Sequence, residues 1–382
     1  MQREETPIYF SGINSLRFFA ATSVIITHIE LLKSSLGFKN YWKNTFIFNL
    51  GGLGVYFFFV LSGFLITYLL LEEKSRYTKI KIRDFYIRRV LRIWPLYYLI
   101  LIIGFFILPH FNIFHISYLE NSFHDNFNTN LILYVGILPN LAFSMFPAVP
   151  NIGQAWSIGV EEQFYLLWPW VISKSKNIVK TLLIIITTIV LLKVCVLLMG
   201  NFYSHSSWYK VLKLFVAMSK FECMAIGGIG AYYLFTKDDV LSIIYNKAIF
   251  LVSITMVPVL IYITPDVLQD GIHIVYSILF LIIILNISNG NMFRKNENII
   301  LNYLGKISYG LYMYHLMIIP FVLYVFKNTI SISSEGLSNI LIYTGTISLT
   351  IVISSISYHF LETPFIKFKS KFSPVKSGDD KS

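Results

Sequence analysis

The chain has 382 residues, of which 55% are hydrophobic and only 13% are charged, and its mean hydropathy is +0.65. These values exclude an ordinary soluble domain and indicate a membrane protein. The net charge of +11 is explained by orientation in the membrane and attraction to anionic lipid head groups, so it does not indicate nucleic-acid binding.

Apolar runs long enough to cross a bilayer recur along the whole chain. They predict an all-α fold, a polytopic membrane helix bundle of about 10 transmembrane helices. We expect one integral-membrane domain over residues 1–365 and a short polar cytoplasmic tail over 366–382. A further run, 131–147, is short and contains Pro139 and Pro147, which favours a re-entrant or interfacial piece. The predicted spans are 14–35, 47–71, 88–108, 155–173, 181–199, 211–235, 248–264, 271–289, 303–326 and 339–360.

The basic residues are placed asymmetrically between the two sides of this predicted bundle. The connection 72–92 contains eight Lys and Arg residues, whereas 109–154 contains none. By the positive-inside rule the first is cytoplasmic and the second external, which puts both termini in the cytoplasm. We therefore expect a multi-pass protein of the cell membrane, and the frequent Ile, Lys, Asn and Phe fit a bacterial source.

Two ionisable residues, Arg17 and His28, interrupt the first predicted span. Eleven residues separate them, which is almost three helical turns, so both lie on one face, roughly 16 Å apart along the axis. Ionisable groups at membrane depth usually face a polar path. The alternative is an arginine that extends to the interface and a hydrogen-bonded core histidine.

The connection before the third span ends in an arginine cluster formed by Arg88, Arg89 and Arg92. Arg88 and Arg92 are spaced i, i+4 and share a face, while Arg89 points about 100° away. Because arginines bind phosphate oxygens in pairs, the cluster could hold a phosphorylated donor. The alternative is contact with lipid phosphates.

Two adjacent carboxylates, Glu161 and Glu162, lie near the predicted external end of the fourth span. Ser157, Glu161 and Tyr165 share one face at i, i+4 and i+8. Glu161 could accept a hydrogen bond from an imidazole or bind a sugar hydroxyl. The alternative is a helix start, where acidic residues favour the helix dipole.

Two histidines occur late in the chain. His315 shares a face of the ninth span with Ser308 and Tyr312, near mid-membrane, and fits a core residue as well as a site residue. His359 is predicted to close the cytoplasmic side together with Glu362. The sequence contains no metal-ligand spacing and no glycine-rich phosphate loop, so we expect neither a metal nor a permanently bound cofactor.

In this order, the motifs resemble the membrane acyltransferase-3 family, multi-pass enzymes that O-acylate glycans and related acceptors in bacterial envelopes. The resemblance covers nearly the whole chain, from Arg17 to Pro364. The motifs are Arg17 with His28, residues 59–65, Arg88-Arg89 with Arg92-Ile93, Trp156-Ser157 with 161–165, 308–312 with His315, and 362–365.

The resemblance implies an acyl-CoA donor, usually acetyl-CoA, with His28 as the catalytic residue and Arg17 as its motif partner. We expect neutral His28 to act as a general base on an acceptor hydroxyl, or to take the acyl group and pass it on. Glu161 would orient the imidazole or the acceptor. The donor phosphates would bind Arg88, Arg89 and Arg92, and the substrate would also contact Trp156, Ser157, Glu162, Tyr165 and His315.

Two departures from the family pattern accompany this resemblance. His315 is followed by Leu316 and Met317 where relatives often have a nearby proline. Many relatives carry a fused extracellular hydrolase-like domain that we do not find here, so a second transfer step would need a separate protein.

The competing hypothesis is a transporter or flippase for a glycan or a lipid-linked precursor. Ten spans and mid-membrane ionisable residues are compatible with it. The two halves of the chain show no detectable repeat, which disfavours it.

Overall fold

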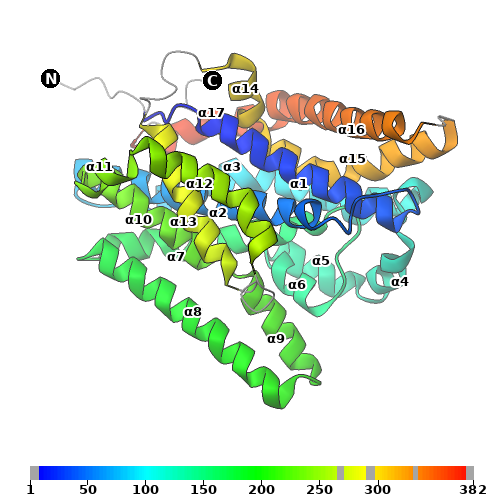
Figure 1. The fold of residues 1–382 in the computed structure, drawn as a ribbon, viewed down its shortest axis with the longest axis horizontal. Helices are drawn as coiled ribbons and strands as arrows, with labels where there is room; N and C mark the ends of the chain where they lie inside the picture. The colour runs from blue at the N-terminus through cyan, green and yellow to red at the C-terminus, as the bar shows by residue number, and fades with distance from the viewer. Residues whose placement is uncertain (1–7, 265–270, 290–296, 330–333, 376–382) are drawn as a thin grey trace.

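The computed structural model describes residues 8–264, 271–289, 297–329 and 334–375, and these fold into a bundle of helices (Figure 1). This confirms the predicted all-α class. The α-helices are α1 (Ile13–Ser35), α2 (Thr45–Tyr77), α3 (Ile82–Ile102), α4 (Ser117–Asp125), α5 (Phe127–Val135), α6 (Pro139–Met145), α7 (Trp156–Lys174), α8 (Ile178–Tyr203), α9 (Ser207–Met218), α10 (Phe221–Thr236), α11 (Val240–Ile244), α12 (Lys247–Ile263), α13 (Ile272–Ser288), α14 (Ile299–Lys306), α15 (Ser308–Thr329), α16 (Glu335–Ser357) and α17 (Thr363–Lys369).

Seven helical segments in the described ranges are long and apolar enough to cross a membrane. Two of the remaining predicted spans correspond to the shorter apolar helices α12 and α13, with 17 residues each. The last corresponds to α7, which has 19 residues and includes the two carboxylates Glu161 and Glu162. Each of the ten predicted spans is therefore helical, while the number of crossings and the orientation of the termini stay predictions.

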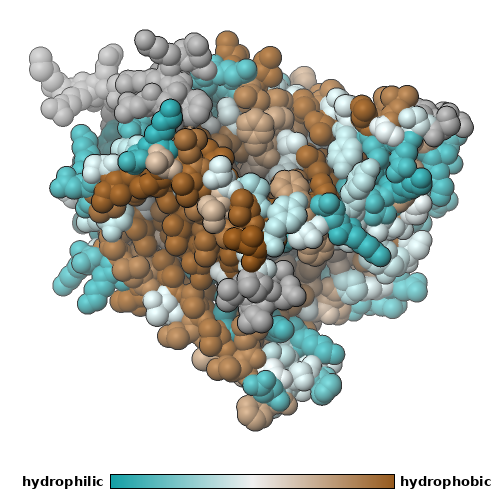
Figure 2. Space-filling model, in the orientation of Figure 1, coloured by the Kyte–Doolittle hydropathy of each residue, from teal (hydrophilic) through white to brown (hydrophobic). Residues whose placement is uncertain are grey.

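The predicted span 211–235 is two helices, because the chain bends at Ser219 and Lys220 between α9 and α10. Helices α8 and α9 form a hairpin that projects from the rest of the bundle (Figure 1). Large apolar side chains such as Leu183, Ile184 and Leu198 are exposed on α8. Brown, hydrophobic atoms cover much of the face shown in Figure 2, as expected for a surface that contacts lipid tails.

The stretch 131–147 contains parts of two short helices, α5 and α6, joined by residues 136–138. Nine residues of α5 extend only about 13 Å, so neither helix can cross a bilayer. This agrees with the prediction that no span is formed here.

Glycines allow α2 to pack closely against its neighbours. A Cβ atom on Gly63 would lie 1.9 Å from the carbonyl oxygen of Met224 in α10, and one on Gly227 would lie 2.0 Å from the oxygen of Val60. Since the two backbones are in direct contact, only glycine fits at either position. This crossing fixes α10 against the middle of α2.

We call the end of the bundle at which α2 ends, with Lys74 and Arg76 in its last turn, the basic end. The ends of several helices meet there. Lys74 near the end of α2 donates to the carbonyl oxygens of Ile172 and Ser175, at 3.0 and 3.3 Å. Tyr77 donates to the carbonyl oxygen of Pro374 at 3.0 Å. The positive-inside pattern predicts that this end faces the cytoplasm.

The beginning of the predicted polar tail is packed rather than solvated. Ile366, Lys369 and Val375 are buried, and α17 contacts α3. The domain boundary predicted at residue 365 stays a prediction, while α17 beyond it packs against α3. Residues 376–382 lie outside the described ranges.

A buried ion pair closes the opposite end of α1. The Nζ of Lys33 lies 2.6 Å from Oε1 of Glu30, and both side chains are almost completely buried. Lys33 also donates to Asn339 at 2.8 Å, and Tyr343 donates to Glu30 at 2.8 Å, so the pair joins α1 to α16.

We expect Lys33→Ala to lower the free energy of unfolding by about 3–5 kcal/mol, because it leaves the Glu30 carboxylate buried without its partner. The matched control is Lys39→Ala, which removes an ion pair with Glu335 that is exposed on the surface. Denaturant unfolding in detergent micelles measures both. Equal stability of the two variants would contradict the assignment.

Candidate active site

A cavity of about 220 Å³ extends from the basic end into the bundle. Its walls come from residues 8–10 and helices α1, α2, α3, α7, α15 and α17. Four cationic side chains line it: Arg17, Arg89, Arg92 and Lys369. Lysine and arginine at this density favour an anionic ligand such as a phosphate ester.

The three arginines of the cluster have different surroundings. Arg88 is buried and forms an ion pair with Glu73 at 3.0 Å, and it donates to the carbonyl oxygen of Phe372 at 2.8 Å. It does not line the main cavity, so this geometry favours a structural role for Arg88 over the predicted contact with the donor. Arg89 and Arg92, spaced i, i+3, are the two that face the cavity.

A buried carboxylate, Glu362, accompanies the cavity arginines. It lies within electrostatic range of Arg92 and Arg17. The chain forms a π-helix over Tyr358–Glu362. In this π-helix the side chains of His359 and Glu362, which the sequence predicts to act together, lie in different surroundings. His359 is exposed and contacts Tyr303 at 3.3 Å, while Glu362 is buried, so the predicted shared role is wrong.

Glu161 lines the cavity and accepts hydrogen bonds from the hydroxyls of Ser62 and Tyr165. It lies at a different depth from the one predicted. Gly54 packs against Ala20 in the antiparallel pair α1 and α2, and Ser62 follows Gly54 by eight residues, about 12 Å toward the basic end. His28 lies in the opposite direction from Ala20, so the prediction that Glu161 orients its imidazole is wrong.

The other residues predicted from the motif around Glu161 fall into two groups, those that line the cavity and those that do not. Ser157 and Tyr165 line the cavity. Glu162 instead accepts a hydrogen bond from the indole of Trp94 at 3.0 Å, outside the cavity lining. Trp156 packs edge-on against Phe59, with ring centroids 6.3 Å apart. Glu162 and Trp156 thus contact other side chains of the bundle, and their predicted contacts with substrate stay predictions.

The partner of His28 is His315. Their Nδ1 and Nε2 atoms lie 3.0 Å apart, and the ring centroids are 5.0 Å apart. His315 is completely buried, whereas His28 is partly exposed. The two helices that carry them, α1 and α15, thus bring together residues 287 positions apart in the chain.

The hydrogen bonds of His315 define the tautomer of both neutral rings. Nδ1 of His315 lies 2.6 Å from the carbonyl oxygen of Tyr312, which can only accept, so this nitrogen carries a hydrogen. Nε2 of neutral His315 is then an acceptor, and Nδ1 of His28 must donate to it. The remaining nitrogen of His28, Nε2, therefore has a free lone pair, as a general base or nucleophile requires. His315 contacts His28, and its predicted contact with substrate stays a prediction.

Tyr312 separates this imidazole pair from the cavity. Its side chain lines the cavity, and its ring lies 5.8 Å from that of His315 between centroids. Neither histidine is among the residues that line the cavity. The candidate site therefore consists of a cationic cavity and an imidazole pair, with Tyr312 in contact with both.

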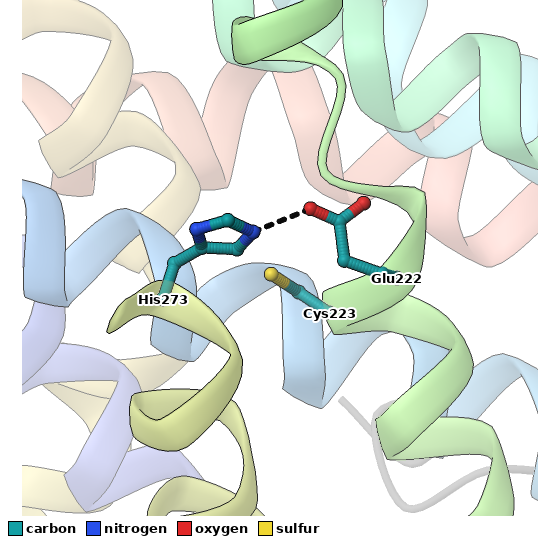
Figure 3. A group of neighbouring side chains, drawn as sticks. All are labelled: Glu222, Cys223 and His273. Carbon is teal, nitrogen blue, oxygen red and sulfur yellow. Dashed lines mark hydrogen bonds and ion pairs between the residues drawn. The ribbon is translucent and has the colours of Figure 1, made fainter. Parts of the chain in front are cut away.

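A second buried cluster joins α10 and α13 (Figure 3), and Lys193 of α8 also contacts it. The ligand atoms of Glu222, Cys223 and His273 lie within 4.8 Å of one another, close enough to hold a metal ion. However, Lys193 donates to Glu222, and His273 Nε2 lies 2.6 Å from the same carboxylate oxygen. Because the ammonium group already balances the carboxylate charge, we interpret the cluster as a charge-paired network that connects helices.

Comparison with known proteins agrees with the motifs. Residues 10–359 match the family model described as an acyltransferase domain. The chain therefore belongs to this family, the acyltransferase-3 family of membrane proteins.

Individual relatives are bacterial. The chain is 30% identical to O-acetyltransferase OatA of Staphylococcus aureus strain NCTC 8325 / PS 47 over 403 residues, which cover 99% of this chain and 61% of that protein. It is 29% identical to putative O-acetyltransferase SACOL0978 of strain COL over 389 residues, covering 94% of this chain and 58% of the relative. It thus spans about three fifths of these relatives. No solved structure matches the chain.

Proposed function

We propose that the protein is a membrane-embedded O-acyltransferase that moves an acyl group, usually acetyl, from acyl-CoA to a hydroxyl of a carbohydrate acceptor. The observation that carries the proposal is the position of the imidazole pair behind a cavity with four cationic side chains. Family membership supports the reaction type, and the names of the relatives support O-acetyl transfer.

The cavity suits the phosphorylated part of acyl-CoA. Arg89 and Arg92 on α3 and Lys369 on α17 would bind the phosphates near the basic end. Arg17, on the same helix as His28, would line the path of the thioester arm. With the predicted orientation, the donor enters from the cytoplasm and the acceptor reaches His28 from the external side.

The chemistry follows from the free lone pair on Nε2 of His28. In a direct route, Nε2 takes the proton of the acceptor hydroxyl while its oxygen attacks the thioester carbonyl, and the CoA thiolate leaves. In a relay, Nε2 itself attacks the carbonyl and the CoA thiolate leaves with the proton that the acylated ring gives up. The acceptor oxygen later displaces the imidazole, and the acceptor hydroxyl returns a proton to the ring. In both routes the departing thiolate receives a proton to give CoA, and His315 holds the ring of His28 in the required tautomer.

A transfer assay in membrane vesicles separates this proposal from transport. Vesicles that contain the chain are supplied with acetyl-CoA labelled in the acetyl group, together with envelope glycan. We expect the label to appear in an ester on the glycan, released by mild base. Movement of unmodified glycan across the membrane without ester formation would favour the transporter.

The arginines give a test of the donor site. We expect Arg89→Gln with Arg92→Gln to raise the KM for acetyl-CoA by roughly tenfold or more, since each charged hydrogen bond contributes about 1.5–3 kcal/mol. The matched variant is Arg88→Gln, which removes the ion pair with Glu73. It should lower stability and leave the KM of the folded protein unchanged. A larger KM effect for Arg88→Gln would reverse the two roles.

A further inference from the structure

The inner end of the cavity is closed by a small group of contacts around Tyr312. The hydroxyl of Tyr312 lies 2.7 Å from Oγ of Ser157, and the Tyr312 ring packs edge-on against Phe58 with centroids 6.1 Å apart. All three residues line the cavity. They come from α15, α7 and α2, so the closure ties three helices together.

The hydrogen bonds of this closure are not all satisfied at once. The carbonyl oxygen of Gln154 lies 3.2 Å from both the Ser157 and the Tyr312 hydroxyls, and the hydroxyls also contact each other. Two hydroxyl hydrogens cannot fill three contacts, so one acceptor position stays open. The side-chain Oε1 of Gln154 is also buried with no hydrogen-bond partner in the described structure. The hydroxyls of Ser157 and Tyr312 can therefore exchange one acceptor for another without losing a hydrogen bond.

Tyr312 is also connected directly to the imidazole pair. Its backbone oxygen accepts the hydrogen of His315 Nδ1 at 2.6 Å, and its ring contacts the ring of His315. The side chain thus has the cavity on one side and the imidazole pair on the other. A thioester that moved directly from the cavity toward His315 would have to displace this side chain.

We propose that Tyr312, held by Ser157 and Phe58, is a gate between the donor cavity and His28. The gate is closed in this structure and opens when the donor arm displaces the Tyr312–Ser157 contact. It keeps water and ions in the cavity away from the acceptor path until a thioester arrives. This inference rests on the proposed function for the identity of the donor, but the barrier itself does not depend on it.

The test measures access to position 28. His28→Cys is made together with Cys195→Ala, because Cys195 is exposed. A charged methanethiosulfonate is added to inside-out vesicles, and modification of the introduced thiol is followed by mass spectrometry. We expect slow labelling with Tyr312 present and labelling at least tenfold faster with Tyr312→Ala. Tyr312→Phe, which keeps the ring and loses the hydroxyl, should give an intermediate rate.

Tyr309→Ala is the matched control. Tyr309 lies one turn earlier on α15, lines the same cavity and donates to the carbonyl oxygen of Ile93 at 2.9 Å. It should leave the labelling rate at position 28 unchanged. Equal labelling with and without Tyr312, or no acceleration in both Tyr312 variants, would overturn the gate.

Binding of acetyl-CoA distinguishes the gate from the proposed function. We expect calorimetric titration in detergent to detect acetyl-CoA binding to the chain that retains Tyr312. If Tyr312→Ala accelerates labelling and acetyl-CoA does not bind, the gate stands and the proposed donor is wrong.

Discussion

Replacing His28 with alanine is expected to lower the rate of acyl transfer roughly 10²- to 10⁴-fold, the usual contribution of a general base. The fold and the binding of acetyl-CoA should survive, because His28 is partly exposed and lies outside the residues that line the donor cavity. Transfer of labelled acetyl groups to glycan in vesicles measures the rate, and calorimetric titration with acetyl-CoA in detergent measures binding.

The matched control for this experiment is His359→Ala. His359 is exposed in the π-helix that follows α16, and its described hydrogen bond is to Tyr303. Its removal should leave the transfer rate unchanged. A His28→Ala protein that transfers at the unmodified rate would remove this imidazole from the mechanism.

The second large effect is expected at His315. His315→Ala removes the acceptor for the Nδ1 hydrogen of His28, so the ring loses its preferred tautomer and orientation. We expect kcat to fall roughly 10- to 100-fold, as for outer partners that orient metal-bound histidines. The KM for acetyl-CoA should stay the same, because His315 does not line the cavity.

His315→Gln separates orientation from packing. A glutamine carbonyl oxygen can accept the Nδ1 hydrogen of His28, so this variant should keep more activity than His315→Ala. Steady-state kinetics of the two variants decide the matter. Equal kcat values in both, with equal stability, would show that the contact between the rings has no part in positioning.

The helices could be predicted from the sequence because apolar run length determines membrane spans directly. The position of Arg17 and His28 on one face of a single helix, about three turns apart, also follows from helix geometry. The sequence did not specify where neighbouring helices begin. Helix α7 starts where Trp156 meets Phe59, in the middle of α2, and this places Glu161 nearer the basic end than predicted.

Contacts between distant segments decided the remaining differences. Arg88 and Arg92 share a face in an ideal helix, but Glu73 binds Arg88 and leaves Arg89 beside Arg92 at the cavity. The helical spacing of residues in the sequence could not indicate that Glu73 is the partner of Arg88. The same holds for Glu222 and His273, which are 51 residues apart in the chain. The burial of Glu30 and Lys33 likewise depends on α16, which is distant in the chain.

The most direct measurement is the mass of the envelope glycans in cells that produce this chain, compared with cells that produce the His28→Ala form at equal membrane abundance. The account predicts glycan masses increased by one acetyl group or another short acyl group in the first cells and no such increase in the second. Acylated glycan in both, or in neither, would contradict the central role of His28 in acyl transfer.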